Sequence, residues 1–383
     1  MKRSYIAKRF QSSGAGLSLD TEALAKYKDI IDLSIGDTDF TTDESIINAA
    51  FRDARAGHTH YGDPKGDPEL IDAVCRAWEE DFGQRLSRDH VLVSASSCLG
   101  MALVMLAILD PGDEVIVFSP YFPMYREQIE LAGGVCVDVP TYASEDYAID
   151  EARLRAAITP RTKAIVFNNP TNPTGMGYDG KTLELLARVA QEHDLLIAAD
   201  EIYTTYLYEG DFRPIRTLPG MAERTITLNS FSKNFLMTGW RVGVIIAEPE
   251  LLAVMNRVNG SLIYSAPSVS QRAAIQALAM RKEIREKYVT AYRDRIFYSA
   301  DRIEKLPYLS LVRPKGTFYL FPGVEKTGLD EKAFCKVLLD QTHVLVSPGT
   351  PFGVSAAGHF RIACTVGIDR LKAAFDRMEK LSF

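Results

Sequence analysis

The sequence lacks paired cysteines, a long apolar run and an excess of basic charge. Its five cysteines are scattered over 383 residues and include no CxxC pair. Neither a disulfide framework nor a cysteine-type zinc site is therefore predicted. The formal net charge of -6 argues against a protein that binds the nucleic-acid backbone or an acidic membrane surface.

Membrane and export signals are also missing from the sequence. No apolar run reaches the roughly 18 residues of a membrane span, and the opening MKRSYIAKRF contains no apolar signal core. We therefore expect a cytoplasmic protein. Histidine is scarce, and His58 and His60 in GHTHYG make a poor metal site by themselves, so no metal is predicted.

Apolar residues make up 46% of the chain, enough to bury a large core in what we expect to be two domains. Short β-branched runs alternate with amphipathic stretches of helical length, which is typical of an α/β protein with a largely parallel, buried sheet. The predicted helices include 99–109 and 181–193. The predicted strands are 91–95, 114–118, 163–167, 195–199, 225–228 and 242–247.

The two ends of the chain differ from its centre. The first forty or so residues are irregular, and a charged helical pattern from about Ser268 leads into the strand signals LSLVRPKGTFYLF and HVLVSP. We interpret these ends as one smaller α+β domain. The expected division is a small-domain segment at 1–45, a large domain at 46–280 and the rest of the small domain at 281–383.

Polar or glycine- and proline-rich segments directly follow five of the predicted strands. They read SASSC, SPYFP, NNPTNPTG, DEIY and SFSK. Ligands of open α/β sheets bind beyond the carboxyl ends of the strands. We therefore expect these five segments to converge on one crevice.

Lys233 stands at the end of the SFSK segment, and Arg241 follows it in MTGWRVG. A lysine in this setting can form an imine with an aldehyde while hydroxyl and arginine neighbours hold the phosphate of that aldehyde. Most lysines are solvated surface charges. Lys233, however, follows an apolar strand among aromatic and glycine residues, where a surface charge would be out of place.

Asp200 ends the apolar run LLIAAD, and a carboxylate there is costly without a cationic partner. A protonated pyridine nitrogen would be such a partner, and a helix N-cap is the alternative. Tyr203 and Asn172 could both donate hydrogen bonds to a ring oxygen. An ordinary turn asparagine is the alternative for Asn172.

Ser96, Ser97 and Cys98 precede an apolar helix, whose free N–H groups form a ready anion site. A simple capping role for either serine is equally consistent with the sequence. Phe122 in SPYFP could stack on a pyridine ring, although an aromatic residue after a strand is more often part of the core.

These segments, in this order, resemble the fold type I pyridoxal phosphate enzymes, specifically the class I/II aminotransferases. The resemblance covers nearly the whole chain, from IGDTDF and YGDPKGDPEL to PKGTFYLF, VSPGTPFG and HFRIACT. It implies pyridoxal 5'-phosphate as cofactor and ping-pong transfer of an amino group from an L-amino acid to a 2-oxo acid. It also implies a homodimer with shared active sites.

The resemblance assigns the catalytic roles to Lys233, Asp200 and Tyr203. Lys233 would carry the cofactor as a Schiff base, Asp200 would bind the pyridine nitrogen, and Tyr203 with Asn172 would bind the ring oxygen. The other cofactor contacts are assigned to Ser96, Ser97, Cys98, Phe122, Ser230, Arg241 and, from the neighbouring subunit, Tyr61.

The same resemblance assigns the substrate α-carboxylate to Arg361 in HFRIACT, whose planar fork suits a carboxylate. Asn172 would assist, and the backbone of Ile35 and Gly36 would close over the group. Without the resemblance, Arg361 would be interpreted as a charge on an edge strand.

The phosphate loop ASSCLG departs from the family, because several relatives with acidic substrates carry lysine where Cys98 stands. We therefore expect substrates with neutral, apolar or aromatic side chains. Lys65 in YGDPKG, reaching over from the partner chain, is the residue that could instead serve a distal carboxylate. The expected pocket walls are Phe40, Phe122, Tyr125 and Tyr264.

Two alternatives stay open at this point. A β-lyase or synthase of the same fold would share the cofactor site and release pyruvate and ammonia from a β-substituted substrate. A pyridoxal phosphate-binding regulator would need an N-terminal DNA-binding domain, for which IGDTDF, beginning at residue 35, leaves no room. Neither nucleic acid nor a membrane is expected as a partner.

Overall fold

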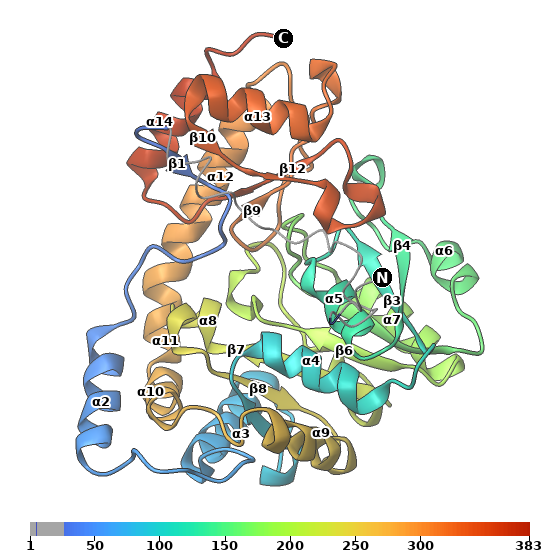
Figure 1. Cartoon of the computed structure of the whole chain (residues 1–383), viewed down its shortest axis with the longest axis vertical. Coiled ribbons are helices and arrows are strands. Elements are labelled where there is room, and N and C mark those ends of the chain that lie inside the picture. The colour runs from blue at the N-terminus through green and yellow to red at the C-terminus, as the bar shows by residue number, and fades with distance from the viewer. Residues whose placement is uncertain (1–4, 6–26) are drawn as a thin grey trace.

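A seven-stranded sheet forms the centre of the molecule in the computed structural model, which describes Tyr5 and residues 27–383 (Figure 1). Its order is β2-β8-β7-β6-β5-β3-β4. Strand β8 is antiparallel to both neighbours, and the other pairs are parallel, which confirms the predicted α/β class. The strands are β2 (Val91–Ser94), β3 (Glu114–Ser119), β4 (Val135–Pro140), β5 (Thr162–Asn168), β6 (Leu196–Asp200), β7 (Thr225–Ser230) and β8 (Gly243–Ile246).

Both faces of this sheet are buried, and the side chains alternate between them. Val115 and Val117 pack in the cluster that contains residues of α4 and α9, whereas Ile116 and Phe118 pack with residues of α7. A strand covered on both faces is apolar over much of its length, which is why six strands were predicted correctly. The flanking helices are α3 (Pro68–Phe82), α4 (Ser97–Ile108), α5 (Met124–Leu131), α6 (Glu151–Ala156), α7 (Gly180–Glu192) and α9 (Pro249–Leu262).

Strand β4 was not predicted, because its sequence VCVDVP lacks a continuous apolar run. It lies at the edge of the sheet, and most of its residues are partly exposed. Asp138 on this edge strand is nevertheless largely buried, and its carboxylate pairs with Arg126 at 3.6 Å.

The C-terminal part of the chain forms a second layered unit around its own core. It follows α10 (Ser268–Ala279) and α11 (Arg281–Ile284), and a π turn (Arg285–Val289) joins α11 to α12. Strand β12 lies between β11 and β9 in an antiparallel sheet. The remaining elements of this unit are β9 (Tyr319–Leu320), β10 (Val344–Leu345), β11 (Ser347–Pro348), β12 (Phe360–Ala363), α12 (Thr290–Glu304), α13 (Glu331–Thr342) and α14 (Ile368–Met378).

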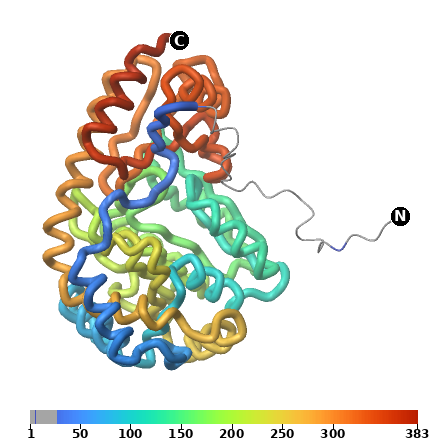
Figure 2. Tube along the Cα trace, turned by 60° about the vertical axis from the view of Figure 1, so that its left-hand side comes forward, coloured from blue at the N-terminus to red at the C-terminus, as the bar shows by residue number. Residues whose placement is uncertain are grey.

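The segment after residue 27 lies against this C-terminal unit before it continues into α2 (Glu44–Arg55), as the blue trace of Figure 2 shows. Its strand β1 (Ile31–Asp32) pairs in parallel with β10. Ile31 and Leu33 belong to the same buried cluster as residues of α12, α13 and α14. Residues 1–4 and 6–26 of the predicted small-domain segment lie outside the described residues. No helix in the described part of the chain is long and apolar enough to cross a membrane.

Candidate active site

A cavity of about 340 Å³ lies beyond the carboxyl ends of the parallel strands, between the central sheet and the C-terminal unit. All five predicted segments reach it, so the expected convergence is confirmed. Every predicted site residue except Tyr61 lines it, namely Ile35, Gly36, Ser96, Ser97, Cys98, Phe122, Asn172, Asp200, Tyr203, Ser230, Lys233, Arg241 and Arg361.

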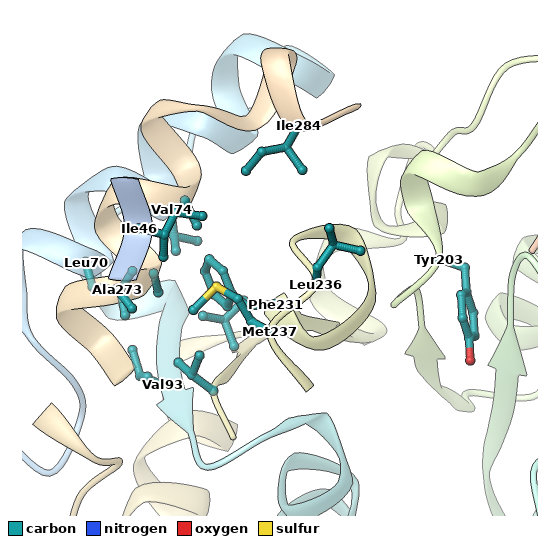
Figure 3. Close-up of a cluster of buried hydrophobic side chains, with 14 of the residues drawn as sticks. Ile46, Leu70, Val74, Val93, Tyr203, Phe231, Leu236, Met237, Ala273 and Ile284 are labelled. Atoms are coloured by element: carbon teal, nitrogen blue, oxygen red, sulfur yellow. The ribbon is translucent and has the colours of Figure 1, made fainter. Parts of the chain in front are cut away.

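Lys233 is positioned by a single helical turn, α8 (Phe231–Asn234), that begins where β7 ends. The hydroxyl of Ser230 caps this turn by accepting the N–H of Ser232 at 3.1 Å. On its apolar side, Phe231 belongs to a buried cluster with Ile46 and Val74 (Figure 3). The backbone around the lysine is therefore held on both sides.

The Lys233 amine faces the cavity and donates a hydrogen bond to the carbonyl oxygen of Gly36. Burial lowers the pKa of this amine to about 8, the Asp37 carboxylate opposes the shift, and the cations of Arg361 and Arg241 add to it. A lysine with this pKa exists partly as the neutral amine near neutral pH, which is the form that acts as a nucleophile or base.

Asp200 ends β6 with a carboxylate that is only 6% exposed. Its Oδ2 accepts a hydrogen bond from the Tyr125 hydroxyl, while its Oδ1 has no partner. Burial raises the pKa of Asp200 to about 6, and the bond from Tyr125 opposes this shift. The nearby turn Thr204–Tyr206 has Tyr203 as its N-cap, so the helix-cap alternative for Asp200 is wrong. A free, buried carboxylate oxygen facing a cavity suits a cationic N–H donor.

Arg361 is buried, at 5% exposure, in the middle strand of the C-terminal sheet. Its Nη1 donates to Asn172 Oδ1 at 3.0 Å and its Nη2 to the Ser34 carbonyl at 2.6 Å. The guanidinium lies 4.8 Å from the centre of the Tyr319 ring and 5.0 Å from that of Phe352. The edge-strand interpretation is therefore wrong, because β12 is paired on both sides.

No carboxylate of the described residues pairs with Arg361, and its Nε has no hydrogen-bond partner. Burial lowers the pKa of the guanidinium. An uncompensated buried cation is costly, so an anion bound in the cavity would satisfy it. The guanidinium is therefore suited to a carboxylate ligand.

The opposite end of the cavity is built from the start of α4. Ser96 is the N-cap of this helix and accepts the N–H of Leu99 at 3.4 Å while it also lines the cavity, so it has both predicted features. A Cβ on Gly243 would lie 2.8 Å from the backbone nitrogen of Ser97. Only glycine therefore lets β8 come this close to the helix start, whose first residues line the cavity together with Ser230 and Arg241.

The two tyrosines on the C-terminal side of the cavity are linked. The hydroxyls of Tyr203 and Tyr319 lie 3.1 Å apart, and burial raises the pKa of both. A Cβ on Gly36 would lie 1.9 Å from the Tyr319 hydroxyl, which explains the glycine in IGDTDF. Both phenols are thus neutral hydrogen-bonding groups rather than charges.

Several lining residues were not predicted. Asn168 accepts the N–H of Asn172 at 2.8 Å and donates to the Asp200 carbonyl at 2.9 Å. Gln128 donates to the Cys98 carbonyl at 2.8 Å. Asn168 stands in the NNPTNPTG segment, so its position after the strand could have indicated it. No local signal indicated Gln128 or Tyr319.

The expected pocket walls are only partly present in one chain. Phe122 and Tyr125 line the cavity, but Phe40 packs against Tyr288 in the core, and Tyr264 does not line it either. Tyr264 instead contacts Tyr61 with ring centroids 5.1 Å apart. The expectation for Phe40 and Tyr264 is therefore wrong within a single chain.

Tyr61 and Lys65 lie away from this cavity. Tyr61 is 87% exposed, and the Lys65 amine pairs with Asp89 at 2.8 Å. In one chain, neither side chain contributes to the site.

Comparisons with known proteins agree with this geometry. Residues 28–378 match the family model for aminotransferase class I and II. The chain is 38% identical to an aspartate/prephenate aminotransferase of Thermus thermophilus, over 92% of this chain and 91% of that relative. It is 35% identical to an arginine–pyruvate transaminase of Pseudomonas aeruginosa, over 99% of this chain and 97% of that relative.

A solved structure of a single mutant of the aspartate aminotransferase of Thermus thermophilus has the same fold. It superposes with a TM-score of 0.92 at 35% identity, covering 99% of this chain and 100% of that one. The chain belongs to the class I and II aminotransferases, fold type I enzymes that use pyridoxal 5'-phosphate to transfer an amino group between an amino acid and a 2-oxo acid.

Proposed function

We propose that catalysis by this aminotransferase depends on Lys233, Asp200 and Arg361. One observation carries the proposal: these three charged side chains line one cavity, and Asp200 Oδ1 and Arg361 Nε are buried there without partners. Unsatisfied buried polar atoms are costly, and a bound group that pairs with these two atoms would offset that cost. Bound pyridoxal phosphate supplies an electron sink for negative charge at the substrate Cα.

Asp200 would hold the pyridine nitrogen in its protonated form. The neutral Tyr203 hydroxyl and the Asn172 amide would donate to the ring oxygen, and Phe122 would stack on the ring. The N–H groups at the start of α4 bind the phosphate, as expected for an anion at a helix N-terminus. The phosphate contacts are Ser96, Ser97, Cys98, Ser230 and Arg241.

Lys233 would hold the cofactor covalently, and its free amine would take the proton from the substrate Cα. Its pKa of about 8 supports this role, because an effective general base has a pKa near the working pH. Its position within the capped turn α8 limits how far the amine can move.

Arg361 binds the substrate α-carboxylate through its planar fork, with Asn172 as its fixed neighbour. The backbone of Ile35 and Gly36 covers the same group. Because Arg361 is already anchored to the Ser34 carbonyl, little side-chain entropy is lost when a carboxylate binds.

We further propose that the substrates have neutral, apolar or aromatic side chains. The cations that line the described cavity are Lys233, Arg241 and Arg361, and each already has a role. A distal carboxylate would need another cation, since an unpaired charge in this cavity costs several kcal/mol. The relatives named above act on different side chains, so family membership does not decide this point.

The specificity constant for half-transamination is expected to be at least about tenfold higher with phenylalanine, leucine, methionine or alanine than with aspartate or glutamate. Cys98→Lys should raise the constant for aspartate by about tenfold or more, because it adds a cation to the cavity wall. Cys98→Ser is the matched control and should leave the constant for aspartate unchanged. Aspartate preferred tenfold over every neutral donor in the wild type would contradict the proposal and implicate Lys65.

We also propose a homodimer in which Tyr61 binds the cofactor phosphate of the neighbouring subunit. The 87% exposure of Tyr61 and its contact with Tyr264 support a surface that a second copy covers. Other exposed large apolar side chains are Phe51, which precedes Tyr61 in the sequence, and Leu262 and Ile263, which directly precede Tyr264.

Mixing Lys233→Ala chains with Tyr61→Phe chains tests this dimer. A mixed dimer would contain one site with both native residues, so activity should exceed the sum of the two separate variants. Tyr61→Phe alone should weaken cofactor binding by about tenfold, the value of one charged hydrogen bond. Simple additivity in the mixture, or a fully active monomer, would refute the arrangement.

We also propose that the small domain comprises 1–45 and 281–383 around the large domain 46–280. The pairing of β1 with β10 and the shared cluster of Ile31 and Leu33 support this division. A cytoplasmic location is supported by the five cysteines, which are free thiols as in a reducing compartment.

A further inference from the structure

A second cavity, of about 200 Å³, lies on the other side of the turn that carries Lys233. Ser230 lines both this cavity and the active site. Its walls come from α3, from the segment after Tyr203, from β7 and α8, and from α11 with the π turn that follows. It is thus a separate space that shares one short element with the catalytic centre.

The interior of this cavity is aromatic and its polar groups are largely satisfied. Trp78 and Phe82 contribute one wall, with ring centroids 4.7 Å apart, and Phe231 and Phe235 stack at 5.1 Å on another. The indole N–H of Trp78 already donates to Gln84 at 3.1 Å. A ligand entering here would meet ring faces rather than hydrogen-bonding groups.

The floor is closed by a small hydrogen-bonded network around Asn234. Its amide donates to the Thr204 hydroxyl at 2.8 Å and accepts from the Thr205 hydroxyl at 2.9 Å. These three side chains therefore satisfy one another and leave little capacity for a polar ligand at that end.

The rim carries positive charge. Arg281 is neutralised by Glu80 and Asp81, with a distance of 3.0 Å to the latter. Lys282 and Arg285 are exposed, and within the described part of the chain neither forms an ion pair. Arg285 begins the π turn, a distortion that is common at functional sites.

We propose that this cavity binds a small aromatic carboxylate, with its ring among Trp78, Phe82, Phe231 and Phe235 and its carboxylate at Lys282 and Arg285. The apolar interior would contact the ring of such a molecule, and the two unpaired cations would pair with its carboxylate. The cavity is smaller than the active-site cavity, which must hold cofactor and substrate, so it suits a ligand of about single-ring size.

Occupancy of this cavity acts on the catalytic lysine through α8. Phe231 and Asn234, which line the cavity, lie two residues before and one residue after Lys233. The Tyr206 hydroxyl donates to the Lys233 carbonyl at 2.9 Å and so ties the same turn to the segment of Thr204 and Thr205. A ligand against Phe231 and Asn234 therefore contacts the turn that positions the amine.

Calorimetric titration of the holoenzyme with 3-phenylpropionate tests the site, with uncharged 3-phenylpropanamide as the ligand control. Arg361→Leu is included to remove binding of the probe at the substrate carboxylate site. We expect binding to persist in Arg361→Leu and to weaken about tenfold or more when Lys282→Ala and Arg285→Ala are added, the loss expected of charge-assisted contacts. Lys287→Ala, a cation of the same helical segment outside the cavity, should leave the affinity unchanged.

A second variant tests the apolar part of the cavity without altering charge. Ala77→Leu places a larger side chain in the wall and should abolish binding, while the thermal midpoint reports whether the fold is intact. The probe should also move the pH midpoint of the cofactor absorbance in Arg361→Leu, but not after Lys282→Ala and Arg285→Ala are added. The proposal would be overturned if Arg361→Leu alone abolished binding of the probe. It would also be overturned if neither the loss of the rim cations nor Ala77→Leu changed the affinity.

Discussion

Lys233→Ala is expected to lower the single-turnover rate of amino-group transfer by about 10⁴-fold or more, because it removes both the covalent attachment and the general base. The variant should also lose the visible absorbance of attached cofactor. Borohydride treatment followed by peptide mapping should trap cofactor on the peptide containing Lys233 in the wild type and not in the variant.

Two further variants make this result interpretable. Lys65→Ala removes a lysine that pairs with Asp89 outside the cavity, and it should leave rate and absorbance unchanged. Lys233→Arg retains a cation beside Gly36 but has no nucleophilic amine at neutral pH, so it should resemble the alanine variant. Trapped cofactor in Lys233→Ala would show that another residue carries it.

Asp200→Asn is expected to raise the barrier to transamination by several kcal/mol, which corresponds to a loss of about three orders of magnitude in rate. The reason is the environment of the carboxylate, which is 6% exposed and has one oxygen free toward the cavity. An amide in the same place cannot stabilise a protonated pyridine nitrogen. Single-turnover absorbance with saturating substrate measures this rate directly.

The control for Asp200→Asn is Tyr125→Phe, which removes only the hydrogen bond to the other carboxylate oxygen. Its effect should be smaller, about 1–2 kcal/mol, the value of a hydrogen bond to a charged group. Cofactor content should remain near that of the wild type in both variants, because the phosphate contacts are unchanged. A near wild-type rate for Asp200→Asn would refute the role of the ion pair.

The parts of the fold that were predicted are those in which local sequence and environment agree. Strands β3 and β5 are apolar over most of their length because helices cover both sheet faces, so their runs are visible without any tertiary information. Strand β4 was missed because an edge position removes the constraint that produces such a run. By residue type, the exposed part of β4 cannot be distinguished from a loop.

The contacts of Asp200 illustrate the same limit at the active site. Its place after a buried strand was visible in the sequence, as was the need for a cationic partner. Its hydrogen bond to Tyr125 joins residues 75 positions apart, whereas the sequence indicated that tyrosine only as part of an apolar or amphipathic pocket wall. The position of a hydroxyl relative to a carboxylate depends on how α5 packs on the sheet, which periodicity does not encode.

The sequence alone determined the α/β class, the convergence of five strand-end segments and the chemistry available at Lys233, because each depends on residues that are neighbours in the chain. Only the tertiary structure decided that Arg361 is a buried, central-strand cation anchored to Asn172, 189 positions away, and that Tyr319 lies over Gly36. It also decided that Tyr61 and Tyr264 lie together outside the cavity. Contacts between distant segments follow from the packing of whole layers against each other, and a local pattern of residue types carries no information about that packing.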